Sequence, residues 1–319
     1  MTGTLPSILL RRLAQAVSVA IFVSVLCFFM VRQLPGDLAY RIAAGRYGYD
    51  LVDSRSAEAV RQELGLDRPV LTQLRDWLLS VAQFDLGQSL VTARPVTSEI
   101  SYYLLGTLQL TAVALTLAIA IGVAVGVFAA RHPGGVVDRI TDVWVAAVRA
   151  LPPFLLGLLL ITVFSVQLGL LPAVGHGSAT SIVLPAATLA VGLSGLFARV
   201  TRDAVVEVQT SEYAQFARTK GLSERLVLVR HVARNAGVLV VPYIGAQALV
   251  LIEGVVVVES LFGWQGLGHA LVHAVFWRDI PMLQATVLTL ALIVVAINTV
   301  VDVTMARLDP RPRRESIQA

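Results

Sequence analysis

The sequence has few charged residues and almost no cysteine or lysine. Only 14% of its 319 residues are charged, 56% are hydrophobic, and the mean hydropathy is +0.75. This composition does not fit a water-facing surface, which excludes a soluble enzyme and a disordered chain. The single cysteine, Cys27, cannot form an intramolecular bridge, which excludes a disulfide scaffold. Lys220 is the only lysine, and this preference for arginine says nothing about mechanism.

Patterns for binding nucleotides or metals are also absent. The sequence has no Gly-x-x-x-x-Gly-Lys-Ser/Thr motif, so we expect no ATP site in this chain. The histidines are scattered, except that His269 and His273 are four residues apart and could share a helical face. No carboxylate or cysteine accompanies them there, which favours structural or surface use over metal binding. We therefore expect no catalytic residue, no metal, no cofactor and no nucleic-acid partner.

Six apolar segments are long enough to cross a membrane as helices, because roughly 20 apolar residues span its hydrocarbon core. The fourth is the shortest and has Pro185 near its start, where a proline is best tolerated. Pro152 and Pro153 are expected to open or kink the third. The expected spans are Leu13–Val31, Leu108–Ala130, Val143–Phe164, Ile182–Phe197, Ala236–Val258 and Met282–Val303.

The arginines predict the orientation of these spans. If the N-terminus is cytoplasmic, the cytoplasmic regions hold 16 of the 25 basic residues, as the positive-inside rule requires. Both termini are then expected in the cytoplasm. Arg11 and Arg12 before an apolar run also resemble a signal peptide, but no small-residue cleavage site follows, which favours a retained first helix.

These boundaries predict an all-α membrane protein with two long polar regions. An N-terminal tail and first helix cover 1–31, an outer segment covers 32–100, a transmembrane core covers 101–303, and a tail covers 304–319. Six apolar residues of the outer segment are spaced as one face of a short helix, so we expect an ordered cap there. They are Val70, Leu71, Leu74, Trp77, Leu78 and Val81.

The second polar region is a cytoplasmic loop at about 203–235. Its pattern predicts an amphipathic helix, a turn at Gly221 where φ can be positive, and a second short helix. One interpretation is a basic helix lying on anionic lipid headgroups. The other is a docking surface for a partner protein. Composition alone does not choose between them.

Three ionisable residues near the spans have functional and structural interpretations. Glu253 is expected to line the outer end of a translocation path, because charges inside a membrane usually face a bundle interior or a wet cavity. Glu259 and Phe262 are candidates for the same path or its gate, but for Glu259 we favour pairing with basic residues of the outer segment or a place among headgroups. Asp302 is expected to pair with Arg307.

Several ordered motifs resemble one family over about 280 residues. The stretch Glu212–Leu222 is similar to the cytoplasmic "EAA" loop of membrane subunits of bacterial binding-protein-dependent ABC importers, and the long outer segment is similar to their dipeptide/oligopeptide/nickel branch. The remaining matches are Leu34-Pro-Gly-Asp37, Leu64-Gly-Leu-Asp-Arg-Pro69, Asp85-Leu-Gly-Gln-Ser89, Leu171-Pro172 with Gly175, Ala198-Arg199 with Thr201-Arg202, Arg230-His231, Arg234-Asn235-Ala236, Phe262-Gly-Trp-Gln-Gly-Leu-Gly268, Arg278-Asp279-Ile-Pro281 and Leu308-Asp-Pro-Arg311.

The resemblance implies a type I ABC importer permease fold in the bacterial cytoplasmic membrane. It implies separate ATPase subunits that bind ATP and Mg²⁺, a second homologous permease in a heterodimer, and an extracytoplasmic protein that delivers short peptides. Nickel or another small solute is the alternative substrate, and an ATP-independent secondary transporter is the alternative class. The lack of an obvious inverted repeat and of an acidic site in mid-span argues against that class.

The resemblance also assigns the loop residues that would meet the ATPase. At the motif's Glu-Ala-Ala positions this chain has Gln215, Phe216 and Ala217, so the acidic residue is missing there, and Glu212 is a possible replacement. The proline expected near the end of the loop is absent as well. The assigned residues are Glu212, Tyr213, Gln215, Phe216, Ala217, Arg218, Lys220, Gly221 and Leu222.

Overall fold

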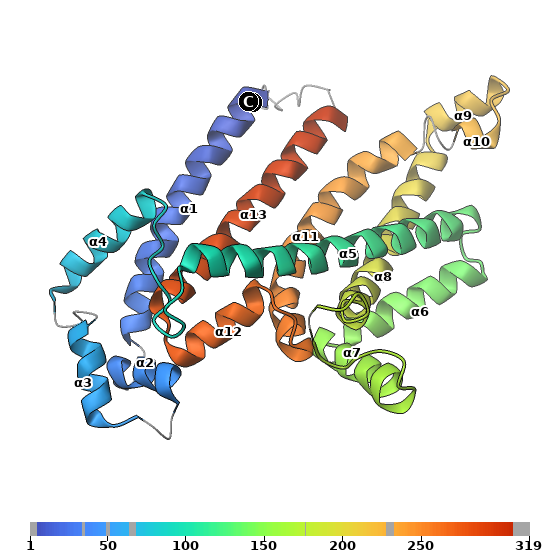
Figure 1. Cartoon of the computed structure of the whole chain (residues 1–319). Helices are drawn as coiled ribbons and strands as arrows, with labels where there is room; N and C mark the ends of the chain where they lie inside the picture. The colour runs from blue at the N-terminus through green and yellow to red at the C-terminus, as the bar shows by residue number, and fades with distance from the viewer. Residues whose placement is uncertain are drawn as a thin grey trace. The chain divides into compact units, whose positions relative to one another are not determined.

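The computed structural model describes residues 5–33, 36–48, 52–63, 68–175, 177–227 and 233–308. Within these ranges the regular structure is helical, apart from one isolated bridge between Gln88 and Pro95. Figure 1 shows the helices, coloured by their order along the chain. The chain divides into two compact units. Unit 1 comprises Met1–Arg12, Gln109–Phe262 and Ala296–Ala319, and unit 2 comprises Leu13–Leu108 and Gly263–Val295.

The helices follow one another with short connections. In chain order they are α1 (Leu5–Gln33), α2 (Leu38–Tyr47), α3 (Ser54–Glu63), α4 (Val70–Ala82), α5 (Val96–Arg131), α6 (Val136–Ala150), α7 (Pro153–Leu160), the π-helix η2 (Ile161–Gln167), α8 (Val183–Gln209), α9 (Glu212–Thr219), α10 (Glu224–Val227), α11 (Ala233–Phe262), α12 (Leu267–Trp277) and α13 (Ile280–Leu308).

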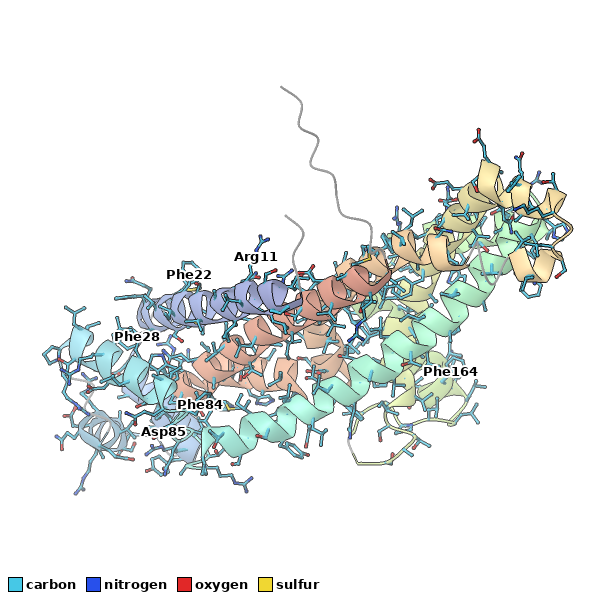
Figure 2. The ribbon with its side chains drawn as sticks, turned by 90° about the horizontal axis from the view of Figure 1, so that it is seen from above. Arg11, Phe22, Phe28, Phe84, Asp85 and Phe164 are labelled. Atoms are coloured by element: carbon cyan, nitrogen blue, oxygen red, sulfur yellow. The ribbon has the colours of Figure 1, made fainter. Side chains whose placement is uncertain are left out.

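Five helices are long and apolar enough to cross a membrane, namely α1, α5, α8, α11 and α13. Two bent pairs, α6 with α7–η2 and the end of α11 with α12, raise the number to at most seven among the described residues. Five of the six expected spans are therefore confirmed as single helices. Figure 2 shows Phe22 and Phe28 on α1, whose outward face exposes Phe22 while Phe28 is buried.

The third expected span, Val143–Phe164, is not one helix. The chain bends by 103° between α6 and α7, a sharper break than a kink. Leu151 and Pro152 both take extended conformations, with ψ of 118° and 144°. Leu151 precedes a proline, and Pro152 precedes another, so steric clash with the following ring disfavours the helical conformation at both.

Helix α6 also begins seven residues earlier than the expected span. Its apolar residues Val136, Ile140 and Val143 are exposed, whereas Asp138 and Thr141 are buried. A helix with polar residues inside and apolar residues outside is typical of a membrane environment, where charges face the protein interior. The charged first half of α6 hid this helix from a search for uninterrupted apolar runs.

Helices α2 and α3, in the segment between α1 and α5, share a small core of their own. Ala39, Ile42 and Ala43 of α2 pack against Val60 of α3. Asp53 accepts a hydrogen bond from Ser56 N at 2.7 Å and caps α3, and these hydrogen bonds lower the pKa of Asp53. Helix α4 confirms the helix predicted from the spacing of apolar residues at 70–81.

Three of the sequence motifs meet inside unit 2, and a fourth contacts α5 there. The carboxylate of Asp279 accepts hydrogen bonds from Ser89 Oγ and from the backbone nitrogen of Leu90, the latter at 3.1 Å. Arg278, buried and in the left-handed conformation with φ 54°, donates to Gly36 O at 3.0 Å. Trp264 Nε1 donates to Gly106 O at 2.9 Å, on the first turns of α5. The motifs thus fix the ends of helices to one another.

In unit 1 the two ends of the described chain are joined by an ion pair. Arg12 donates to Asp302 Oδ2 from Nε at 2.8 Å and from Nη2 at 2.5 Å. The expectation that Asp302 pairs with Arg307 is therefore wrong. Local spacing suggested the neighbour five residues away, but the fold brings an arginine from α1 beside α13.

Candidate functional site: the α9 helix and its turn

The loop that the sequence singled out folds as predicted, as a helix, a turn and a second short helix. Helix α9 follows the end of α8 after two residues, with Ser211 extended at its start. Glu212 lies in the first turn, where a negative charge is favoured by the helix dipole. After the turn at Gly221, α10 begins at Glu224. The side chain of Tyr213 lies outside the described residues.

Gly221 ends α9 in a Schellman motif. The nitrogen of Gly221 donates to Arg218 O at 2.9 Å, and that of Leu222 donates to Ala217 O at 3.3 Å. Gly221 has φ 79°, a left-handed conformation that side chains with a Cβ rarely adopt. Leu222 turns back and packs on the same core as α9. The predicted role of Gly221 in ending the helix is confirmed.

One face of α9 is anchored to the protein by two alanines. Ala214 and Ala217, three residues apart, are buried among Val205 and Val208 of α8 and Val240 of α11. Only a small side chain lets the backbone of α9 come this close. Sequence reasoning listed Ala217 and missed Ala214, which the spacing of two small residues on one face could have revealed.

A hydrogen bond from Arg218 joins α9 to the end of α8. Its Nη1 donates to the carbonyl oxygen of Gln209, the last residue of α8, at 3.0 Å. Carbonyls at a helix C-terminus have no partner within the helix. A guanidinium there donates to one of them and interacts favourably with the negative end of the helix dipole. Arg218 therefore links α8 to α9 and does more than add positive charge to the surface of α9.

The opposite face of α9 is open. Phe216 is 61% exposed, and Lys220 lies over its ring with Nζ 4.5 Å from the centroid. Glu212 and Gln215 are exposed on the same helix. An exposed aromatic ring with a cation and polar groups around it resembles the centre and rim of a protein interface. The residues predicted for docking are therefore divided between an inner and an outer face.

Two of the three residues expected along a translocation path, Glu259 and Phe262, are buried within unit 1. Glu259 is fully buried, so it does not lie among lipid headgroups, and Phe262 is buried too. The Phe262 ring lies against α7, since a Cβ at Gly157 would lie 3.2 Å from it, and Phe262 O accepts from Gly175 N at 3.1 Å. The side chain of Glu253 lies outside the described residues. Their role in a path stays a prediction.

Unit 2 holds a cavity of about 220 Å³. Its walls include Glu99, Tyr103, His269, His273 and Trp277. The two histidine rings are 4.5 Å apart between centroids, which confirms that they share a face of α12. Among the residues that the structure describes, no group of three or more histidine, cysteine or acidic side chains is arranged to hold a metal ion.

Comparison with known proteins agrees with this architecture. Solved structures of an amino acid ABC transporter and of the inward-facing MetNI methionine ABC transporter match with TM-scores of 0.50 and 0.55, at 19% and 18% identity. Each covers 66% of this chain, and 94% and 96% of the matched chains are covered. At this identity the likeness shows the fold alone, which is that of ABC importer permeases.

Curated relatives are far more similar in sequence. The glutathione transport system permease proteins GsiC of Pectobacterium atrosepticum and Escherichia coli K12 are each 40% identical over 304 residues, covering 95% of this chain and 98% of theirs. Residues 5–111 match the N-terminal family of binding-protein-dependent transport system membrane components. Residues 122–314 match the binding-protein-dependent transport system inner membrane component family. The chain belongs to this family and is a multi-pass membrane permease of an ABC importer.

Proposed function

We propose that this chain is one of two permease subunits in an ATP-driven importer of short peptides, and that its ATPase docks on the outer face of α9. The observation that carries the docking is the division of α9 into an anchored face and an open face. Ala214, Ala217 and Arg218 fix the helix to α8, so a force applied at Phe216 moves α8 as well. A basic helix lying on lipid needs no such anchoring.

The ATPases supply the chemistry. ATP and Mg²⁺ bind to those separate subunits, since this chain has no phosphate-binding loop. Their closure on ATP rotates the membrane helices as rigid bodies, and this rotation alternates access to a path shared with a second, homologous permease. An extracytoplasmic binding protein delivers the substrate. The chain itself performs no covalent step.

The substrate class follows from the relatives. Permeases named for glutathione, a small peptide, are 40% identical to this chain over nearly their whole length. We expect peptides of two or three residues, and nickel or another small solute is the alternative. The test reconstitutes this chain with its partner permease, its ATPases and its binding protein in liposomes, and measures uptake of labelled dipeptide, glutathione and nickel. Uptake of nickel alone would contradict the peptide assignment while leaving the permease assignment intact.

Both termini and α9 are proposed to face the cytoplasm, as the arginine distribution predicts. After replacement of Cys27, single cysteines at Ser54 or Thr92, which are exposed in unit 2, should react with an impermeant thiol reagent from outside. A cysteine at Ser223, exposed just after the turn, should react only in permeabilised cells. Labelling of Ser223 in intact cells would reverse the orientation.

A further inference from the structure

An ion pair between the buried Asp138 and the partly buried Arg202 joins α6 to α8. Arg202 of α8 donates to Asp138 of α6 twice, from Nε to Oδ1 at 2.9 Å and from Nη2 to Oδ2 at 2.6 Å. The backbone nitrogen of Gly134 also donates to Asp138 Oδ2, at 2.8 Å. A two-pronged contact between guanidinium and carboxylate fixes orientation as well as distance, so α6 and α8 can neither slide nor rotate freely at this point.

The same network has an outer, solvent-exposed arm. Arg199 contacts Asp142, one turn along α6 from Asp138, and both side chains are about half exposed, at 48% and 52%. The side chains of Arg202 and Asp138 are only 23% and 8% exposed. Exposed pairs contribute little because water competes for both partners. Asp138 and Asp142 are therefore two carboxylates on one helix, each facing an arginine of α8, and they differ in burial and in the number of hydrogen bonds they accept. Both arginines also donate to Asp203 of α8, from Arg199 Nε at 3.1 Å and from Arg202 Nη1 at 2.9 Å.

A third helix closes on the same stretch of α8. A Cβ at Gly126 of α5 would lie 2.5 Å from Ala198 O and 2.7 Å from Thr201 Cβ. A Cβ at Gly122 would lie 2.6 Å from Phe197 Cβ. The backbones of α5 and α8 are therefore in direct contact around Arg202, so both α5 and α6 pack on this stretch of α8.

The contacts of α5 and α6 with α8 around Arg202 lie between α9 and the bend at Pro152. Arg202 is seven residues before Gln209, roughly 10 Å along α8 at 1.5 Å per residue, and α9 is bonded to Gln209 through Arg218. On the other side, α6 runs to the bend and then into α7, which packs on α8 and α11. Displacement of α9 thus reaches α6 through the Asp138–Arg202 contact.

We propose that Asp138 and Arg202 form a clamp that passes the movement of α9 to α6 and α7, and that their specific role is to couple ATP hydrolysis to transport. This inference rests on the proposed docking of the ATPase on α9. A clamp of this kind is a positioning pair, because it acts by holding α6 and α8 together. A buried ion pair can also serve folding alone, so the test must separate stability from coupling.

The experiment compares Asp138→Asn, Arg202→Gln and the double variant in the reconstituted complex with its binding protein. Arg202→Gln removes the guanidinium that pairs with the buried Asp138 carboxylate, and Asp138→Asn leaves Arg202 with Asp203 as its remaining carboxylate partner. Both single changes are expected to lower the melting temperature and the yield of complex, Arg202→Gln by more. The double variant removes both charges, so its melting temperature and its yield of complex should return towards those of the unmodified complex. Because the two-pronged contact is still lost, the number of ATP molecules hydrolysed per peptide transported should rise about fivefold or more, the size of an ordinary coupling energy.

Asp142→Asn is the matched control, because it makes the same chemical change one turn away on the exposed arm. Its ratio of ATP to peptide should stay within about twofold of the unmodified complex, since exposed ion pairs contribute little. A normal ratio in the double variant, or an equal rise in Asp142→Asn, would overturn the clamp. If the unmodified complex retains no ATPase on purification, the proposed docking fails instead, which is a separate and recognisable result.

Discussion

Helices α9 and α4 are both short and amphipathic, but they are held in different ways. In α9, Ala214 and Ala217 are buried, Arg218 bonds to α8, and Gly221 ends the helix in a Schellman motif. In α4 no residue is buried, and Leu71 is 74% exposed. At the end of α4, Phe84 is exposed in a left-handed conformation (Figure 2).

This difference indicates which helix can transmit a displacement to the rest of its unit. A helix that is packed on one face and exposed on the other can transmit a movement. When a partner displaces α9, the helix α8 to which it is bonded moves as well. A helix with no buried residue can adapt to what it meets without disturbing the rest of its unit. We therefore expect substitutions in α9 to alter coupling or folding, and substitutions on the apolar face of α4 to be tolerated by the fold.

The largest effect is expected from Ala214→Leu. Three more carbon atoms at a fully buried site force α9 away from α8, at a cost of about 1–3 kcal/mol. The melting temperature of the purified complex should fall and the ATPase should be lost during purification. Gln215→Leu, a similar apolar change at the exposed neighbour, is the control and should leave the melting temperature unchanged. Equal stability of the two variants would contradict the anchored face.

Gly221→Val comes next. A β-branched residue at φ 79° costs about 1–2 kcal/mol or more, and because nothing lies within 4 Å of the site the strain arises in the backbone alone. The protein should still reach the membrane, but stimulation of the ATPase by the loaded binding protein should be weakened or uncoupled from uptake. Gly221→Asn, which tolerates this conformation, should keep most of the coupling. Normal coupled transport by the valine variant would show that the turn is only a surface feature.

Phe216→Ala should separate docking from folding. The ring is mostly exposed, so its loss should change the melting temperature of the chain little. As an aromatic anchor in an interface it should contribute at least about 1 kcal/mol to ATPase affinity, or roughly fivefold or more in Kd. Binding of purified ATPase measured against Thr219→Ala, an exposed neighbour, provides the comparison. Unchanged affinity would move the docking site away from this face.

The smallest effect is expected at α4. Leu71→Ser should change the free energy of unfolding by no more than about 0.5 kcal/mol, because the side chain already contacts solvent or lipid rather than protein. Val60→Ala in the neighbouring α3 removes two buried methyl groups and should cost roughly 2 kcal/mol. Thermal unfolding of both variants in detergent tests this contrast. A cost at Leu71 as large as that at Val60 would mean that α4 is held by the protein after all.

Local signals predicted the parts of this fold that depend on neighbours in sequence. The apolar runs gave five long helices, the spacing around Trp77 gave α4, and a glycine after an amphipathic stretch gave the turn at Gly221. Each of these needs only the preferences of a single segment. The outer face of α9 could be anticipated in the same way, from one aromatic residue at helical spacing.

What the sequence did not reveal depends on residues far apart in the chain. The 103° bend was anticipated only as an opening or kink, since its size is set by the packing of α7 on α8 and α11. The contacts of Asp138 with Arg202 and of Asp302 with Arg12 leave no local trace in the residues between them. Ala214 was missed for a related reason: an alanine shows its role only once the helix it touches is known.

The contact between Arg12 and Asp302 has a consequence for how the protein is made. The two residues are separated by 290 positions, so the first helix is synthesised and inserted long before its partner on α13 exists. Until then the guanidinium must be accommodated by water, by lipid phosphate or by a chaperone of insertion. In a chain truncated before α13, Arg12 has no Asp302 with which to pair. The ion pair that fixes α1 can therefore form only once α13 has been synthesised.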